Sequence, residues 1–327
     1  MRSTIMLAVL GILLAVMTPV VAGAEGFKVT LLGTGTPAPR IDRFSSSTLV
    51  EVGEEKLLFD CGRGVTIRLW ELKIPMRTIT ATFLTHLHSD HVVGLPDLWL
   101  TSLLPPLYGQ RTKPFRIWGP TGTKEMTTYL EKAFAADRKI RIDDEKIPPE
   151  AFTFETTEIQ QGVVYERNGV KVTAFDVDHG DYIKPSLGYR IDYGRHSVVL
   201  SGDTRYSENL IKFAKGADVL IHEVGMAPAK LLAMDTPQAA AARRIIGHHT
   251  TPEEAGKVFE QVKPKLAVYS HLVLTTTDPA FKAPNENDVV EATRKTYAGP
   301  LEMGEDLMSI DVGDKVEVRR FGAISKK

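Results

Sequence analysis

The sequence contains a single cysteine, Cys61, in 327 residues. One thiol excludes an intrachain disulfide and a zinc site built from several thiolates, so any metal site has to use histidine and carboxylate side chains. An excess of charge is also missing, because 40 lysines and arginines stand against 41 aspartates and glutamates. The chain therefore has no strong overall field that would hold a nucleic acid or an anionic membrane without local help.

Long hydrophobic runs are missing as well, apart from one near the start of the chain. Ile5–Met17 is apolar, follows the positive Met1-Arg2 and precedes the small residues Ala22-Gly23-Ala24. Its length is short for a membrane span, which needs about 20 residues, and the pattern is typical of a signal peptide. We expect residues 1–24 to be removed and residues 25–327 to be exported, periplasmic or secreted, without a membrane anchor. An uncleaved anchor is the alternative.

The rest of the chain has the composition of an ordinary globular protein, with 43% hydrophobic and 25% charged residues. Short apolar runs typical of strands alternate with helical stretches, and three helices have recognisable N-caps at Ser207, Thr236 and Thr251. Arg138–Glu150, rich in charge and proline, is expected to be a loop. Strands and helices mixed along the whole length predict one α/β domain.

The strongest chemical signal is Thr85-His86-Leu87-His88-Ser89-Asp90-His91, which follows the apolar run Ala81–Leu84. Four metal-binding side chains lie within six positions, and their spacing suits a loop at the end of a strand rather than a helix. His86 and His88 can face one metal ion while Asp90 and His91 face another.

Three further candidates stand at or near the ends of predicted strands. His179 follows Val170–Phe175, Asp203 follows Ser197–Ser201, and His271 comes just past Lys265–Ser270. Loops at strand ends converge on one edge of a sheet, so these side chains are expected to join the first cluster. Five histidines and two aspartates are enough for two divalent ions, and this donor set suits zinc, with iron and manganese as alternatives.

These motifs resemble those of the metallo-β-lactamase superfamily, over a stretch from about Phe27 to His271. The resemblance implies a single-domain, four-layer αββα sandwich with two metal ions. It also implies a role for each residue: His86, His88 and His179 hold one ion, Asp90, His91 and His271 hold the other, Asp203 bridges them, and Asp60 buttresses the site.

Smaller motifs resemble the branch that contains ribonuclease Z and the zinc arylsulfatases. They are Leu32–Pro37, Phe59–Gly64, Ser201–Thr204, Ile221–Glu223 and His248–Thr251. By this resemblance His248, in a His-x-Thr element, assists the leaving group, so Asp90 and His248 are the candidate catalytic residues. His222 is either a support for the metal ligands or a packed core histidine, and His249 is expected to face solvent.

The choice of substrate depends on weaker features. Bacterial ribonuclease Z carries a long tRNA-gripping arm between the residues that match His179 and Asp203, whereas here only 23 residues separate them. The stretch from Gly94 to Pro120 looks like the arylsulfatase type, with apolar residues such as Leu103 and Tyr108 available for an aryl group.

The sequence thus predicts an exported hydrolase with two metal ions that cleaves aryl sulfate or related phosphate esters through a metal-bridging hydroxide. A ribonuclease Z-like phosphodiesterase or endonuclease is the alternative, followed by a lactonase or β-lactamase. The expected partner is a small-molecule ester rather than a nucleic acid, and a homodimer is left open.

Overall fold

The computed structural model describes residues 26–105 and 109–322. The predicted signal peptide, residues 1–24, lies outside this part, and so does Tyr108, one of the apolar residues expected to be available for an aryl group. Export therefore stays a prediction, which N-terminal sequencing of the mature protein tests.

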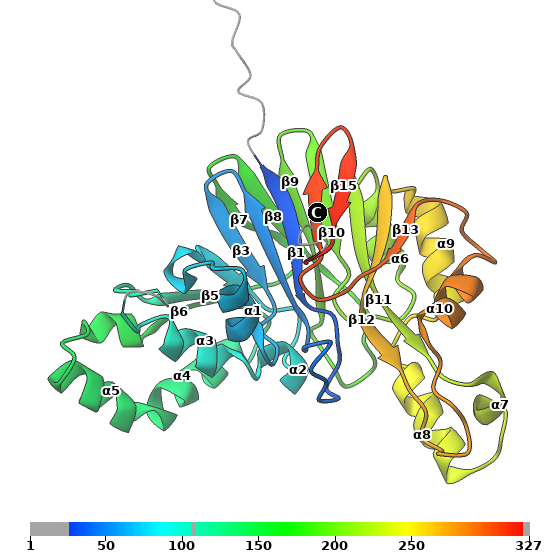
Figure 1. Ribbon diagram of the computed structural model, residues 1–327, viewed down its shortest axis with the longest axis horizontal. Coiled ribbons are helices and arrows are strands. Elements are labelled where there is room, and N and C mark those ends of the chain that lie inside the picture. Colours follow the sequence, from blue (N-terminus) through cyan, green and yellow to red (C-terminus); the bar gives the residue numbers. More distant parts are fainter. Residues whose placement is uncertain (1–25, 106–108, 323–327) are drawn as a thin grey trace, which may run out of the picture.

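Two mixed sheets form the centre of the molecule (Figure 1). The first has the order β15-β14-β1-β2-β3-β4-β5-β6 and the second the order β13-β12-β11-β10-β9-β8-β7. The strands of the first sheet are β1 (Phe27–Gly33), β2 (Ser47–Val52), β3 (Glu55–Phe59), β4 (Ala81–Phe83), β5 (Phe115–Gly119), β6 (Phe154–Glu158), β14 (Ser309–Val312) and β15 (Val316–Arg319). Those of the second are β7 (Gly162–Arg167), β8 (Val170–Asp176), β9 (Leu187–Tyr193), β10 (His196–Leu200), β11 (Val219–Met226), β12 (Leu266–Leu274) and β13 (Leu301–Met303).

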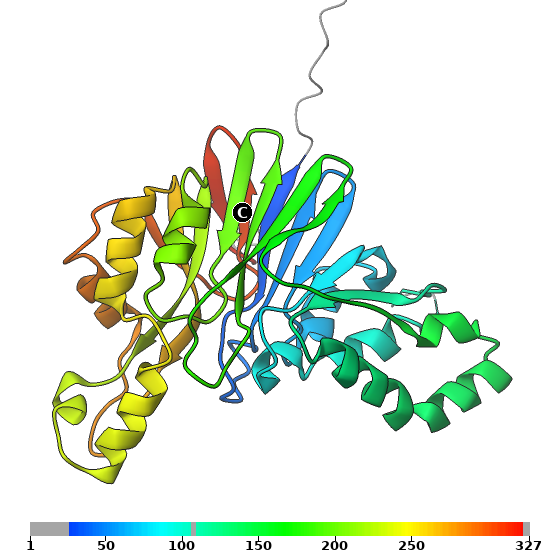
Figure 2. The ribbon, with the colours of Figure 1, turned by 180° about the vertical axis from the view of Figure 1, so that it is seen from behind.

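Helices cover the outer face of each sheet (Figures 1 and 2). On the first sheet they are α1 (Val65–Glu71), η1 (Met76–Thr78), α2 (Ser89–Val92), α3 (Leu95–Thr101), α4 (Thr123–Ala133) and η2 (Pro149–Phe152). The helix α5 (Ala135–Asp143) follows α4 and extends away from the sheet (Figure 1). On the second sheet the helices are α6 (Glu208–Ala214), α9 (Pro252–Val262) and α10 (Glu286–Thr293). Two more, α7 (Ala229–Leu232) and α8 (Pro237–Ile246), pack on each other in a small hydrophobic cluster of their own. Among the residues that the structure describes, no helix combines the length and apolar character needed to cross a bilayer.

The alternation of side chains along the strands explains the layers. Leu57 and Phe59 of β3 point into the core between the two sheets, whereas Leu58 packs against the helices outside. In the second sheet, Val198 faces the inner core and Val199 packs under the outer helices. Because the side chains of a strand point alternately to its two faces, each apolar strand contributes to two cores. The predicted four-layer αββα sandwich in a single domain is confirmed.

The predicted helix starts are confirmed, whereas one predicted loop is wrong. Ser207, Thr236 and Thr251 cap α6, α8 and α9 through their side-chain oxygens. Arg138–Glu150 was expected to be a loop, yet α5 runs through Asp143. Its charges lie four residues apart: Arg141 pairs with Asp137 at 3.0 Å and with Glu145 at 2.9 Å. Such pairs stabilise an exposed helix, which the composition alone does not reveal.

Candidate metal centre

All seven predicted ligands lie close together. Two of them, Asp90 and His91, belong to α2, which lies at one edge of the sandwich (Figure 1). The motif that follows β4 supplies four of them, and the loops after β8 and β10 supply His179 and Asp203. The seventh, His271, lies within β12. Strands and loops far apart in sequence thus bring their polar side chains to a single place.

Three imidazoles form the first half of the cluster. His86 Nε2 lies 2.9 Å from His88 Nδ1, and His179 Nε2 lies 3.3 Å from the same atom. The other nitrogen of His179, Nδ1, donates to the carbonyl of His248 at 2.9 Å, which leaves Nε2 free of its proton and directed at the group. The three nitrogens are therefore arranged to share one ion, as the resemblance implies.

The second half gathers around Asp203. His271 Nε2 lies 3.0 Å from Asp90 Oδ2, and His91 Nε2 lies 3.6 Å from it. Asp203 Oδ2 lies 3.3 Å from His91 Nε2, 3.4 Å from His271 Nε2, 3.7 Å from His179 Nε2 and 3.9 Å from His86 Nε2. One carboxylate oxygen is thus close to imidazoles from both halves, which is the position of a bridging ligand.

The state of these side chains fits divalent cations. His91 Nε2 is buried and has no hydrogen-bond partner among the described residues. Burial, followed by the neighbouring His91, lowers the pKa of His86 well below its usual value, and burial lowers the pKa of His179 to about 4. Both rings are therefore neutral at pH 7, the form that binds a metal. Burial alone would raise the pKa of Asp203, but the surrounding imidazoles, His271 first, lower it well below its usual value.

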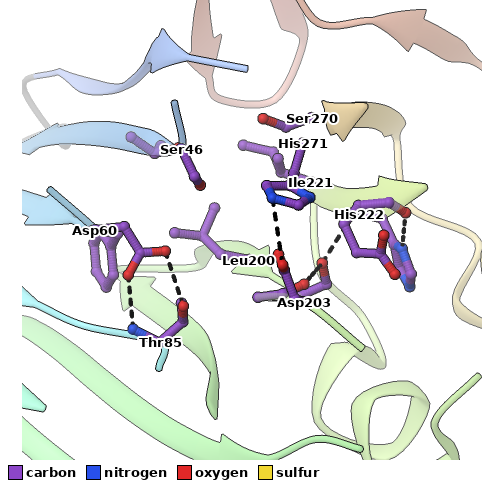
Figure 3. Close-up of a pocket in the computed structure, with 14 residues that line it drawn as sticks. Ser46, Asp60, Thr85, Leu200, Asp203, Ile221, His222, Ser270 and His271 are labelled. Carbon is purple, nitrogen blue, oxygen red and sulfur yellow. Dashed lines mark hydrogen bonds and ion pairs between the residues drawn. The ribbon is translucent and has the colours of Figure 1, made fainter. Parts of the chain in front are cut away.

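Asp60 lies behind the metal-binding motif and is hydrogen-bonded to Thr85 (Figure 3). Its carboxylate lies 2.7 Å from His91 Nδ1 and accepts hydrogen bonds from the backbone and hydroxyl of Thr85 at 2.8 and 2.9 Å. Asp60 adopts a φ of 60°, which is unusual for a residue with a side chain. Because Asp60 fixes which nitrogen of His91 carries the proton, it leaves Nε2 as the donor to the metal.

The backbone around Asp60 requires two glycines. A Cβ at Gly62 would lie 2.5 Å from the carbonyl oxygen of Asp90, and one at Gly94 would lie 2.1 Å from the carbonyl oxygen of Gly62. Only residues without a side chain allow the segment after β3 to pack so closely on the metal-binding loop. Gly62 of the Phe59–Gly64 motif thus allows the backbone of Asp90 to lie close to this segment.

Replacing Asp60 by asparagine is expected to weaken metal binding about 10- to 100-fold, because His91 loses the charged acceptor that orients it. Competition with a chelator measures this affinity. Asp218→Asn is the matched control: Asp218 Oδ2 is also a buried carboxylate oxygen 3.3 Å from a histidine, His196, but it precedes β11 at the end remote from the centre. Unchanged affinity in Asp60→Asn, or an equal loss in the control, would contradict the orienting role.

His271 differs from its prediction in one respect. It was expected just past a strand, whereas β12 continues to Leu274. His271 instead adopts a φ of 48°, and the pairing of β11 with β12 shifts register between His222 and Val224. A bulge within the strand pair thus turns the imidazole toward Asp90 and Asp203.

A histidine and a glutamate to which the sequence assigned no role lie beside the ligands. The expectation that His249 faces solvent is wrong: its side chain is 10% exposed, and its Nδ1 lies 3.0 Å from Glu223 Oε2. Its ring lies 5.2 Å from that of His179 and 5.7 Å from that of His271, centroid to centroid. The buried Glu223 also accepts the backbone N–H of Thr250 at 2.7 Å.

Burial lowers the pKa of His249, but Glu223 outweighs it and raises the pKa to about 8. Since Nδ1 is engaged by Glu223, the other ring nitrogen is left to give a proton to a bound substrate. His248, the predicted proton donor, lines the same cavity as the metal ligands, which is described below, and burial lowers the pKa of its ring. Of the two, His249 has the partner that a general acid needs.

The remaining predicted residues are placed as follows. His222 is buried, its Nδ1 donates to the carbonyl of Glu223 at 2.6 Å, and its ring packs edge-on against Phe259. Leu103, expected in an aryl pocket, packs in the core under the helices of the first sheet. His222 therefore contributes to packing behind Glu223, and Leu103 does not shape the site.

The ligands open onto a cavity of about 390 Å³. His88, Asp90, His179, Asp203 and His271 line it together with His248 and His249. A much smaller cavity of about 40 Å³ lies behind Asp203 and His271, with Ser46 and Ser270 in its wall (Figure 3). The larger one is the place where a substrate can reach the ligands.

The sandwich and its seven converging donors define a member of the metallo-β-lactamase superfamily. In agreement with this, the protein YhfI from Bacillus subtilis, a metallo-β-lactamase fold protein, superposes with a TM-score of 0.66 at 20% identity, over 88% of this chain and 100% of that one. Human tRNase Z, short form, superposes with a TM-score of 0.62 at 22% identity, over 86% of this chain and 98% of that one.

Sequence comparison is more specific. Ribonuclease Z from Mycobacterium sp. (strain KMS) is 35% identical over 298 residues, which are 90% of this chain and 99% of that protein. The family described as "Anti-Pycsar protein Apyc1" matches residues 27–234. The chain belongs to the ribonuclease Z-like branch of the metallo-β-lactamase superfamily.

Proposed function

We propose that the protein is a phosphodiester hydrolase that works with two divalent metal ions, and that these ions are zinc. The observation that carries this is the cluster around Asp203, with the His249–Glu223 pair beside it. The relatives named ribonuclease Z favour the phosphodiesterase alternative over aryl sulfate hydrolysis, which gains no support from them. The proposal thus reverses the order of the two expectations drawn from the sequence.

The chain's own residues divide the work. His86, His88 and His179 would hold one ion, Asp90, His91 and His271 the other, and Asp203 both. Two bound ions supply a nucleophile at neutral pH and polarise the phosphoryl oxygens. His249 would give its proton to the leaving oxygen, while Glu223 holds the ring in place and keeps it protonated.

A small diester suits this site better than tRNA. Between His179 and Asp203 the chain forms only a loop, β9 and β10, so the long arm of bacterial ribonuclease Z has no counterpart there. The net charge of −1 gives no general attraction for a polynucleotide. We therefore take a small-molecule phosphodiester as the substrate and precursor tRNA as the competing candidate.

A substrate panel tests the proposal. The zinc-loaded protein is expected to hydrolyse bis(p-nitrophenyl) phosphate at least ~100-fold faster, in kcat/KM, than p-nitrophenyl sulfate, which corresponds to about 2.7 kcal/mol in the transition state. Removing the metal with a chelator is expected to abolish the activity, and two zinc ions per chain are expected to restore it.

Two results would overturn this assignment. Faster cleavage of p-nitrophenyl sulfate than of the diester would identify aryl sulfate hydrolysis as the function. Precursor tRNA cut with a higher kcat/KM than any small diester would establish the ribonuclease alternative. A homoserine lactone and a β-lactam complete the panel, since turnover of either would identify a different reaction class.

A further inference from the structure

The cavity above the ligands is lined by two kinds of side chain. The metal-binding residues line it together with His248 and His249. Apolar residues from three separate segments line it as well: Pro37 and Ala38 after β1, Ile245 near the end of α8, and Val273 and Leu274 at the end of β12, with Thr36 and Thr275 next to them in the chain. A ligand held by its phosphate at the metal centre can therefore place the rest of its body against these apolar residues, the hydrophobic wall of the cavity.

Lysine and arginine side chains are absent from the described lining of this cavity. Arg205, two residues after Asp203, lines a neighbouring cavity instead and donates to the carbonyl of Gly247 at 2.6 Å. Its Nη1 lies 3.7 Å and 3.8 Å from the carboxylates of Asp178 and Asp181, which neutralise it. Within the described lining of this cavity, no lysine or arginine is therefore available to a second phosphate.

Hydrophobic side chains continue onto the loops that lead into the cavity. Ile41 and Tyr182 are 91% and 100% exposed, and they follow the lining residues Ala38 and His179 by three positions each. The volume of about 390 Å³ is at the small end of the range of about 300–1,000 Å³ for ligand pockets. It can hold one phosphate and one ring system, and not a chain of nucleotides.

We propose that the substrates are small diesters with a single phosphate and one apolar arm that carries a ring. The arm is held by Pro37 and Ala38 together with Ile245, Val273 and Leu274. This rests on the proposed phosphodiesterase function and adds which diesters are chosen. The wall makes contact through aliphatic side chains, so it selects for apolar area rather than for a hydrogen-bonding pattern.

Calorimetric binding of two monoesters to the zinc-loaded protein tests the wall without turnover. Phenyl phosphate and methyl phosphate present the same charged group and differ only in the arm. Phenyl phosphate is expected to bind about 10- to 100-fold more tightly, the gain for burying a ring. Leu274→Ala and Ile245→Ala are each expected to reduce this ratio about 3- to 10-fold and to leave the affinity for methyl phosphate unchanged.

Ile140→Ala is the matched control, because Ile140 is 62% exposed on α5 and does not line the cavity. Zinc content and circular dichroism verify that the variants fold. Equal affinity for the two monoesters in the unmodified protein overturns the inference. A ratio that stays unchanged in both cavity variants, with zinc and fold intact, overturns it too.

A 12-nucleotide single-stranded RNA tests for the missing cations. Between 50 and 200 mM salt, its affinity is expected to fall about threefold, as for contact with one phosphate. A fall of about 50-fold, which corresponds to four phosphates, would contradict a single-phosphate site. If phenyl phosphate binds selectively but no diester is hydrolysed, the proposed function fails and the wall stands. If diesters are hydrolysed without preference for the aryl arm, the wall fails and the proposed function stands.

Discussion

Replacing Asp203 by alanine is expected to remove both metal ions and to lower kcat/KM for a phosphodiester at least ~1,000-fold. The reason is the position of Asp203 Oδ2, which lies within 3.9 Å of imidazole nitrogens from both halves of the cluster. Without Asp203, both halves lose the one carboxylate that they share, together with its negative charge. Metal analysis after gel filtration measures the stoichiometry, and hydrolysis of bis(p-nitrophenyl) phosphate measures the rate.

His271→Ala provides the contrast, because His271 lies near Asp90 and Asp203 on one side of the cluster. This variant is expected to lose mainly one of the two ions. Asp181→Ala is the control for a carboxylate near the site, since Asp181 is 79% exposed and belongs to no ligand group. Equal metal content in the Asp203 and His271 variants would contradict the bridging role.

Much of the fold could be predicted from local patterns. Leu57-Leu58-Phe59 is apolar throughout because β3 is covered on both faces, and such runs marked many of the strands. Thr251 with Glu254 formed the capping box that starts α9. The helix α5 was missed because it has no buried residue and therefore no apolar stripe, so its only signal was the spacing of its charges.

The candidate site divides in the same way. Six of the seven ligands follow strands, where a short polar motif after an apolar run is visible in the sequence. The choice between His248 and His249 cannot be read from the sequence. The two residues are neighbours, and only the turn after α8 decides which ring points toward the ligands. One signal was available: Glu223 lies in β11, whose other residues are almost all buried, and a buried carboxylate requires a partner.

His249→Ala is expected to keep both metal ions and to lose about 10²- to 10⁴-fold in kcat on a diester with a poor leaving group. The loss should shrink steadily as the leaving phenol becomes more acidic, because a better leaving group needs no proton. A series of aryl methyl phosphates of increasing phenol pKa measures the slope. His248→Ala, at the neighbouring ring without a carboxylate partner, is the matched control and is expected to leave the slope unchanged.

The same proton gives a pH signature. With a pKa of about 8, His249 carries its proton at neutral pH and loses it as the pH rises, so the rate on a poor leaving group should fall on the alkaline side. Glu223 raises that pKa against the effect of burial. Glu223→Gln is therefore expected to lower it and to move the alkaline limb to lower pH, while good leaving groups show no such shift. If the limb stays in place in Glu223→Gln, or if His248→Ala changes the leaving-group slope and His249→Ala does not, the proton comes from His248 and not from the buried pair.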